Sequence, residues 1–179
     1  MGDQDFSTTL QVDRTPAEVF EAIVDVRGWW SDSVRGSTRE PGDVFVFEVP
    51  DIHRSTMRLT EVVPGERMVW HVDEAWLSFV AQTDEWTGTD VRFDLAPTAE
   101  GGTELRFTHV GLTPRDECYE VCAGAWSMYV LESLRARVET GLGAPHRLEQ
   151  GITPREEELL ETHAAATKDP AAVAGSSAG

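Results

Sequence analysis

The first candidate for chemistry in this sequence is a histidine at the end of an apolar row. The stretch "ELRFTHVGL" (residues 104–112) alternates as a β-strand does, which puts His109 on the same face as Leu105 and Phe107. A neutral ring there can donate one N–H to a backbone or hydroxyl group and so fix the strand. It can also orient a ligand carbonyl or hydroxyl, or transfer a proton. We expect His109 to have one satisfied hydrogen bond and to present one ring edge to a pocket.

A second candidate is an acid on a neighbouring strand. In the stretch "TMRLTEVV" (residues 56–63), Glu61 has the parity of Met57 and Leu59, so its side chain is expected to face inward. Burial disfavours the charged form of a carboxyl group and would raise its pKa. Paired with His109, Arg58 or Arg67, Glu61 would form either a structural network or an acid–base couple.

Two cysteines, Cys118 and Cys122, are four residues apart on a stretch that is expected to be helical. A structural zinc site needs about four ligands, and no CxxC or HxxxH spacing supplies the others. A thiol beside His109 could form a nucleophilic pair, and otherwise the cysteines are small buried hydrophobic side chains. No phosphate-binding GxGxxG or Walker sequence occurs. The sequence therefore predicts neither a metal nor a cofactor.

The charge balance excludes several classes of partner. Thirty-two acidic residues against fifteen basic ones give a net charge of −17, and Lys168 is the single lysine. Nucleic acids and anionic lipids are bound by clustered Lys and Arg, so neither is expected as a partner. No apolar stretch approaches the roughly 20 residues that span a bilayer, and the start "MGDQDF" lacks the features of a signal peptide. We expect a cytoplasmic protein.

The positions of the helices follow from capping residues. With 179 residues and 40% hydrophobic content, the chain can hold one domain of ordinary size plus a tail. Each of three Thr-Pro pairs is followed by an acid three residues after the Thr, a pattern typical of helix N-termini. Helices are therefore predicted to start after Thr15, Thr113 and Thr153.

The strands follow from a change of period. A strand is predicted at residues 6–12, before a first helix that ends near Gly28. From residue 43 to 110 the apolar residues alternate, and the turns between the runs are too short for crossover helices, so we expect an antiparallel meander of about six strands. Within the ambiguous segment 73–90, a strand is predicted at 77–82.

The last element of the domain is a predicted helix over residues 114–140. Its apolar stripe changes face beside Gly124, between Cys118 and Trp126. A kink near Gly124 is one explanation. The other is that the first half of the helix packs against something different, such as a cavity mouth or a second subunit, which leaves a homodimer open.

The composition changes after this helix. We therefore divide the chain into a domain at residues 1–141 and a segment at 142–179 that comprises a linker, a short polar helix and a disordered end. The short helix has Leu159 and Leu160 as its apolar anchor, so it contacts the domain weakly or not at all. His71 has the opposite parity from Trp70 and is expected to point outward, and the histidines at positions 53, 146 and 163 are expected to be solvated.

This order of elements predicts an α+β fold. One curved antiparallel sheet wrapped around the long C-terminal helix would bury the apolar faces of both. A curved sheet is concave and can leave a pocket beneath the helix. A pocket of roughly 300 Å³ or more would suit a small apolar ligand.

Several motifs in this order resemble a known family. They are "TPAEVFEAIVDVRGWWSD", "EVVPGERMVWHV", "VRFDLAPTAEGGTELRFTHVGL" and "AWSMYVLESLRARVETG". Together they resemble the AHSA-type branch of the START-like (SRPBCC, birch-pollen-allergen-like) superfamily, which is related to activators of a heat-shock chaperone ATPase. The resemblance covers about residues 5–141. One departure is that Ala125, where the family often has Gly, precedes Trp126 in the last helix.

The resemblance implies the helix-grip fold, in which about seven strands wrap around the long helix and two short helices lie near the N-terminus. It also implies a hydrophobic cavity. The lining implied by the resemblance comprises Trp30, Phe47, Trp70, Phe93, His109 and Trp126. Strand parity adds Phe45, Leu59, Glu61 and Phe107 as candidate ligand-binding residues.

The resemblance carries no catalytic motif, so three functions stay open. The chain is expected to bind a small hydrophobic or aromatic molecule in the cavity. Alternatively, it is a cyclase-, aromatase- or hydrolase-like enzyme in which His109 and Glu61 act as acid and base. The third alternative is a protein-interaction or chaperone-regulating module that uses the acidic surface and the tail helix.

Overall fold

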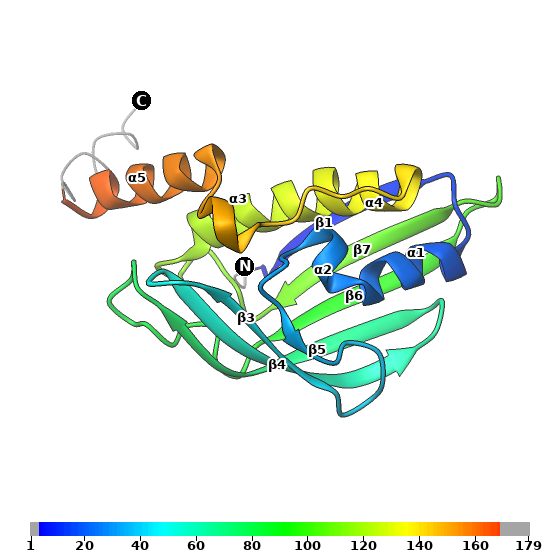
Figure 1. Ribbon diagram of the computed structural model, residues 1–179, viewed down its shortest axis with the longest axis horizontal. Coiled ribbons are helices and arrows are strands. Elements are labelled where there is room, and N and C mark those ends of the chain that lie inside the picture. The colour runs from blue at the N-terminus through cyan, green and yellow to red at the C-terminus, as the bar shows by residue number, and fades with distance from the viewer. Residues whose placement is uncertain (1–3, 169–179) are drawn as a thin grey trace.

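The computed structural model describes residues 4–168 and contains one seven-stranded antiparallel sheet with helices packed on it (Figure 1). The strand order is β1-β7-β6-β5-β4-β3-β2, so β2 to β7 form a continuous meander and β1 pairs with β7. The predicted antiparallel meander is confirmed. The strands are β1 (Phe6–Val12), β2 (Arg35–Gly36), β3 (Val44–Val49), β4 (His53–Val63), β5 (Arg67–Leu77), β6 (Asp90–Pro97) and β7 (Thr103–Val110).

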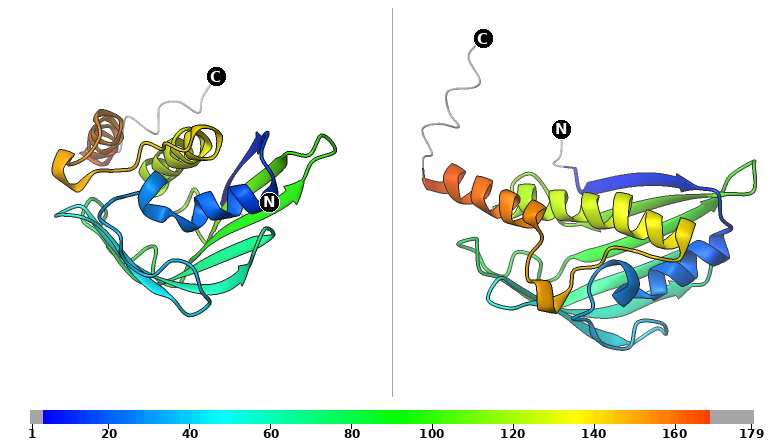
Figure 2. Two further views of the ribbon diagram at one scale, coloured as in Figure 1. Left: turned by 45° about the vertical axis from the view of Figure 1, so that its right-hand side comes forward. Right: turned by 45° about the horizontal axis from the view of Figure 1, so that its top comes forward.

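The sheet is curved, and its concave face wraps around the helices (Figure 2). Two short helices follow β1, and a long helical segment follows β7, as the predicted helix-grip fold requires. The α+β class is therefore confirmed. The helices are α1 (Pro16–Val24), α2 (Val26–Trp29), α3 (Tyr119–Met128), α4 (Arg135–Thr140) and α5 (Pro154–Lys168). In the described part of the chain, no helix is both long and apolar enough to cross a membrane.

Two of the three predicted helix starts are confirmed. At α1, Thr15 and Glu18 form a capping box, in which each side chain accepts a hydrogen bond from the backbone N–H of the other. At α5, the backbone N–H of Thr153 donates to the Glu156 carboxylate, and the backbone N–H of Glu156 donates to the Thr153 hydroxyl.

The remaining Thr-Pro pair, Thr113-Pro114, starts a turn instead of a helix. The backbone N–H and the hydroxyl of Thr113 both donate to Asp116, but α3 begins only after this turn. The carboxylate of Glu85, in the loop after β5, accepts hydrogen bonds from the backbone amides of Glu117 and Cys118. A side chain remote in sequence thus supplies an anionic cap at the start of α3.

The long helix is irregular, but not where a kink was predicted. α3 runs through Gly124 to Met128, so the predicted kink there is wrong. A π-helical segment, Tyr129–Leu134, follows and leads into α4. Its wider turn holds an extra residue, which rotates the apolar stripe of α4 relative to that of α3. Gly124 instead faces α5, since a Cβ there would lie 2.9 Å from both methyl carbons of Leu159.

A β-bulge reverses the side-chain parity near the end of β4. The pairing with β5 shifts between Leu59 and Glu61, so that Thr60 is an extra residue in the ladder. The side chain of Glu61 is consequently exposed, 3.5 Å from that of Arg67. The prediction that Glu61 faces inward is wrong for this reason.

The loop between β5 and β6 replaces a predicted strand. β5 ends at Leu77, so the strand predicted at 77–82 is wrong beyond its first residue. The backbone N–H of Leu77 donates to the carbonyl of Thr83, and that of Ser78 donates to the carbonyl of Ile52. These bonds turn residues 78–89 back toward the connection between β3 and β4.

The segment after α4 also packs against the domain. His146 is 1% exposed, and its Nδ1 lies 3.1 Å from the hydroxyl of Ser31, so the prediction of a solvated His146 is wrong. Its backbone N–H donates to the carbonyl of Trp30, and its carbonyl accepts from the backbone N–H of Asp32. α5 then lies alongside α3 (Figures 1 and 2). The predicted disordered end lies beyond the described residues.

Candidate functional site

Five aromatic side chains form a closed cycle at one end of the concave face. Phe47 stacks on Trp30 and Trp126 stacks on Trp86, with ring centroids 4.2 and 5.7 Å apart, and the rings of Trp30 and Trp126 meet at a tilt, 4.9 Å apart. His53 stands edge-on to both ends of this row, 4.5 Å from Trp86 and 5.1 Å from Phe47. The five rings come from β3, the end of α2, α3, β4 and the loop before β6. Segments far apart in sequence must therefore fold together before the cycle can close.

A cavity of about 70 Å³ lies against this cycle. Its walls are mainly apolar, and α3 and the segment that ends in α5 close the side away from the sheet. Besides the five rings, the cavity is lined by Val49, Ile52, Phe79, Val121, Cys122, Ala125, Tyr129, Ile152, Glu156 and Leu160. A ligand site for a drug-sized molecule usually measures about 300 Å³ or more. The space is therefore smaller than the predicted pocket.

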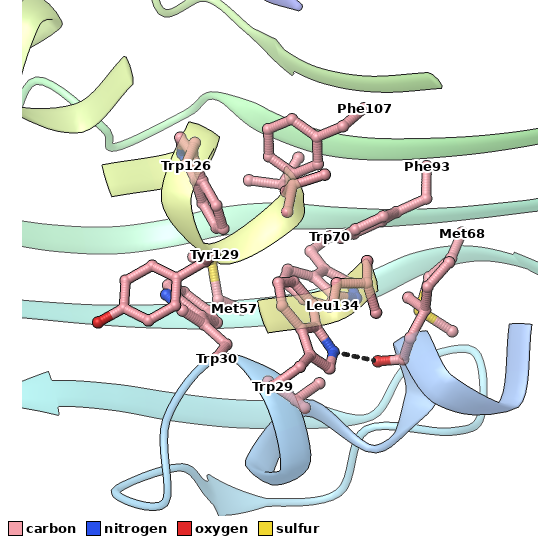
Figure 3. Packing of buried hydrophobic residues seen from close by; sticks show 14 of the residues in the cluster. Trp29, Trp30, Met57, Met68, Trp70, Phe93, Phe107, Trp126, Tyr129 and Leu134 are labelled. Carbon is pink, nitrogen blue, oxygen red and sulfur yellow. Dashed lines mark hydrogen bonds between the residues drawn. The ribbon is translucent and has the colours of Figure 1, made fainter. Parts of the chain in front are cut away.

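The other predicted ring residues lie beneath the cavity, in the core. Figure 3 shows Trp29, Trp30, Trp70 and Trp126 gathered between the long helix and the sheet. Trp70 stacks on Trp30 with centroids 5.7 Å apart and is completely buried. The structure thus brings Trp30, Phe47 and Trp126 to the cavity. It buries Phe45, Leu59, Trp70, Phe93 and Phe107 in the core below.

His109 is fully buried, with a hydrogen bond at each ring nitrogen. The indole N–H of Trp126 donates to Nδ1, at 3.0 Å. The Thr89 hydroxyl donates to the carbonyl of Trp86, so it must accept from the Nε2–H of His109, at 2.8 Å. The neighbours therefore specify a neutral ring with its proton on Nε2. Burial, with a smaller effect of His53, lowers the pKa of His109 to about 3.

His109 therefore holds other residues in position and does not line the cavity. Its ring stands edge-on to Trp86, 4.7 Å between centroids, and it bonds Trp126 on the other side. Both of these indoles belong to the aromatic cycle. Glu61 lies on the opposite, exposed face of the sheet. The acid–base couple of His109 and Glu61 is not formed.

His53 is the histidine that lines the cavity. Its Nε2 lies 2.6 Å from the hydroxyl of Ser55, which is completely buried. Burial lowers the pKa of His53 to about 3, so the ring is neutral near pH 7. His53 is half-buried, and its ring packs edge-on against Phe47 and Trp86, so the prediction of a solvated His53 is wrong.

A buried indole donor lies in the same wall. Within residues 4–168, the buried side-chain nitrogens without a hydrogen-bond partner are Nε1 of Trp70, Nε1 of Trp86 and Nε2 of His146. Of these three residues, Trp86 lines the cavity. An unpaired buried N–H costs about 1–3 kcal/mol, which an acceptor atom could recover.

One acid reaches the cavity from α5. The Tyr129 hydroxyl donates a hydrogen bond of 2.6 Å to Oε1 of Glu156, while Oε2 of Glu156 serves the helix cap. Burial and the adjacent carboxylate raise the pKa of the Tyr129 phenol, so it stays protonated and donates. Cys122 in the wall is a free thiol, and its hydrogen bond with Cys118, together with burial, raises the pKa of Cys118. The described lining of the cavity thus comprises aromatic rings, aliphatic side chains, the Glu156 carboxylate and the free cysteine Cys122.

Sequence reasoning missed several wall residues, each for a local reason. Trp86 and Phe79 lie in a loop whose strand pattern was ambiguous, and Tyr129 lies on the π-helical segment, where a regular helical wheel misplaces it. Glu156 was recognised as a capping residue, but its second oxygen faces Tyr129. In the described part of the chain, no three His, Cys, Asp or Glu side chains lie close enough together to share a metal ion.

Comparison with known proteins gives the family and the fold. Residues 13–139 match a family model described as "Activator of Hsp90 ATPase homolog 1-like protein". A comparison with proteins of curated function gives no match. The solution structure of the Aha1 dimer from Colwellia psychrerythraea is 21% identical with a TM-score of 0.63, and covers 78% of this chain and 99% of that one.

Two further solved structures have the same fold. A protein from Staphylococcus saprophyticus is 21% identical with a TM-score of 0.59, and covers 81% of this chain and 99% of its own. CalU16 from Micromonospora echinospora is 16% identical with a TM-score of 0.53, and covers 89% of this chain and 85% of its own. At these identities the likeness concerns the fold alone.

Proposed function

The chain belongs to the Activator of Hsp90 ATPase homolog 1-like protein family, and from this premise we propose that it binds a small, neutral, mainly apolar molecule within the aromatic cycle. The observation that carries the proposal is a cavity bordered by all five rings of that cycle. Core aromatic residues normally fill their own space, because protein interiors are close-packed.

The wall favours a neutral ligand with a hydrogen-bond acceptor. Glu156 is the charged group of the lining, and the protein as a whole carries a net charge of −17, so an anionic ligand would be repelled. His53 and Tyr129 are both uncharged near pH 7. A carbonyl, ether or hydroxyl oxygen that reached the buried N–H of Trp86 would give this donor a partner.

The site is also preorganised. His109 fixes the indole of Trp126 by a hydrogen bond and packs edge-on against Trp86. Rings that are already held in place lose little conformational freedom when a ligand arrives, which favours affinity. Acid–base catalysis has less support, since both nitrogens of His109 are already bonded and Glu61 lies on the other face of the sheet.

Titration with N-phenyl-1-naphthylamine, a neutral aromatic probe whose fluorescence rises in apolar surroundings, tests the proposal. Ala125 lines the cavity, whereas Ala123 lies on the same helix outside the wall. We expect the wild type and Ala123→Phe to bind the probe, and Ala125→Phe to bind it at least about tenfold more weakly, a loss of about 1.4 kcal/mol. Equal binding by the two variants would place the probe elsewhere and overturn the proposal.

Native mass spectrometry of the purified protein addresses the natural ligand and the assembly together. The Colwellia psychrerythraea structure is a dimer, which supports a homodimer here as part of the proposal. A mass excess of a few hundred daltons over the denatured chain would identify the ligand class. A second polypeptide without any small molecule would favour the interaction alternative.

A further inference from the structure

α5 contributes to the wall of the cavity, although the family match ends before it, at residue 139. Glu156 and Leu160 of α5, with Ile152 just before it, form one side of the lining. With α5 in this position the cavity holds about 70 Å³, whereas sites for drug-sized ligands usually hold roughly 300–1,000 Å³. A ligand with an aromatic ring therefore needs more room than the docked helix leaves.

α5 is attached lightly. None of its described side chains is buried, although Leu159, Leu160 and His163 are partly covered. Leu159 packs on the bare backbone of Gly124, where a Cβ would come within 2.9 Å of its methyl carbons. An element with few buried apolar contacts belongs to the low-stability part of a fold and opens locally.

Two polar contacts complete the attachment, and both end on residues that line the cavity. The Tyr129 hydroxyl donates to Glu156 near the start of α5. Farther along the helix, the Nε2–H of His163 donates to the carbonyl of Phe79, at 3.0 Å. Opening of α5 would thus release the walls of the cavity as well as uncover it.

The chain before α5 provides a fixed point and then a hinge. The Ser133 hydroxyl accepts from the backbone N–H of Ala144, and Asp32 accepts from that of Leu148, so the chain is held up to this point. Gly151 follows with φ 67° and ψ −154°, a backbone conformation essentially confined to glycine. α5 starts three residues later, so a rotation at Gly151 would move the helix and leave the domain in place.

We infer that α5 is a gate whose displacement turns the small aromatic cavity into a ligand-sized site. The inference rests on the proposed function, because the gate regulates access to the same site. In a gated site, the apparent affinity equals the affinity of the open form multiplied by the open fraction. Any change that loosens α5 without touching the wall must therefore tighten ligand binding.

The thiol of Cys122 measures gate opening without a ligand. Cys122 is 4% exposed in the cavity wall, and Cys118, which is completely buried outside the wall, is an internal control for global unfolding. Labelling with N-ethylmaleimide followed by peptide mapping reports each thiol separately. Leu159→Ala should label Cys122 about fivefold faster than the wild type, the factor expected for loss of a half-buried leucine side chain. Glu161→Ala, an exposed change on the same helix, should match the wild type.

The outcomes for Cys122 are decisive for the gate. Unchanged labelling of Cys122 in Leu159→Ala would overturn it. An equal acceleration at Cys118 and Cys122 would also overturn it, because the variant would then be unfolding as a whole. Tyr129→Phe, which removes the bond to Glu156 and keeps the ring, is a second variant and should accelerate labelling in the same direction.

Probe binding separates failure of the gate from failure of the proposed function. N-phenyl-1-naphthylamine should bind Leu159→Ala more tightly than the wild type by the same factor as the labelling rate, and should reduce hydrogen-exchange protection of α5 but not of α3. Binding with α5 protection unchanged would overturn the gate and leave the proposed function standing. A probe that binds neither protein, while Cys122 still labels faster in Leu159→Ala, would overturn the proposed function.

Discussion

The indole N–H of Trp126, on α3, donates a 3.0 Å hydrogen bond to Nδ1 of His109, on β7. This bond joins the long helix to the last strand in the middle of the fold. It also fixes the protonation of the histidine, because a donor at Nδ1 requires the ring to be unprotonated there. His109 is therefore a structural link behind the cavity wall.

Replacement of His109 should therefore reduce stability in a way that depends on hydrogen bonding. His109→Ala leaves the buried N–H of Trp126 unpaired and should lower the free energy of unfolding by about 1–3 kcal/mol, in addition to the cost of the lost packing. His109→Gln can accept from Trp126 and donate to Thr89, so it should lose less. Urea unfolding measures both, and equal losses in the two variants would refute the hydrogen-bond role.

Stability should fall as the pH drops below 6.5. The folded protein keeps His53 and His109 neutral, with pKa values of about 3, whereas both protonate near the ordinary histidine pKa of 6.5 in the unfolded chain. Unfolding therefore takes up protons between these limits, and each histidine contributes a loss of up to about 1.4 kcal/mol per pH unit.

Unfolding free energies at pH 6 and pH 5 test this linkage. His53→Gln and His109→Gln should each reduce the slope by close to one proton, or roughly 1 kcal/mol per pH unit. A mutant slope equal to that of the wild type would mean that the ring in question is already protonated in the folded state.

Glu85 should stabilise the start of α3 from outside the helix. Its carboxylate accepts from the backbone amides of Glu117 and Cys118, at 2.7 and 2.9 Å. Glu85→Ala should therefore cost about 1–2 kcal/mol, as expected for a helix cap. Asp84→Ala is the matched control, because the Asp84 side chain is exposed. Thermal unfolding at neutral pH compares the two variants, and similar unfolding midpoints would contradict the capping role of Glu85.

Ser133 should matter more than another serine on the long helix. Its hydroxyl donates to the carbonyl of Trp29, at 2.6 Å, and accepts from the backbone N–H of Ala144, at 2.8 Å. Ser133→Ala leaves the buried carbonyl of Trp29 and the backbone N–H of Ala144 without this partner and should cost about 1–3 kcal/mol.

Ser127→Ala provides the comparison for this prediction. The Ser127 hydroxyl bonds the carbonyl of Ala123 on its own helix, which already serves the helix ladder, so its loss should change stability by less than about 0.5 kcal/mol. Denaturant midpoints that rank the two serines in the opposite order would contradict the tethering of the 142–148 segment by Ser133.

Local patterns predicted the parts of the fold that depend on local interactions. The capping boxes at Thr15 and Thr153 lie within one helical turn each, and the antiparallel meander follows from the shortness of its turns. The bulge at Thr60 could not be predicted, since it is the partner strand that determines the register. The same holds for Glu85, whose role depends on a loop folding onto a helix that is remote in sequence.

The sequence predicts which residues lie on the inner face of the sheet, but not which of them line the cavity. Strand parity correctly put Phe45, Phe93 and Phe107 on the buried face of the sheet. Parity does not indicate where along the sheet the helix packs directly on the strands and where it leaves a cavity. Rings at the first kind of position are core residues, and rings at the second line the cavity. Trp30, Phe47 and Trp126 meet at the cavity because three elements converge there.

Contact among the indoles couples the fluorescence of five tryptophans. Trp29, Trp30, Trp70, Trp126 and Trp86 form an unbroken series of neighbours, with centroid separations of 4.9 to 6.5 Å, while Trp76 is 43% exposed and belongs to none of these pairs. At such spacing an excited indole passes its energy to the next before it emits. A quencher that touches Trp86 would therefore dim rings buried as deeply as Trp29, and the emission that remains would come from Trp76.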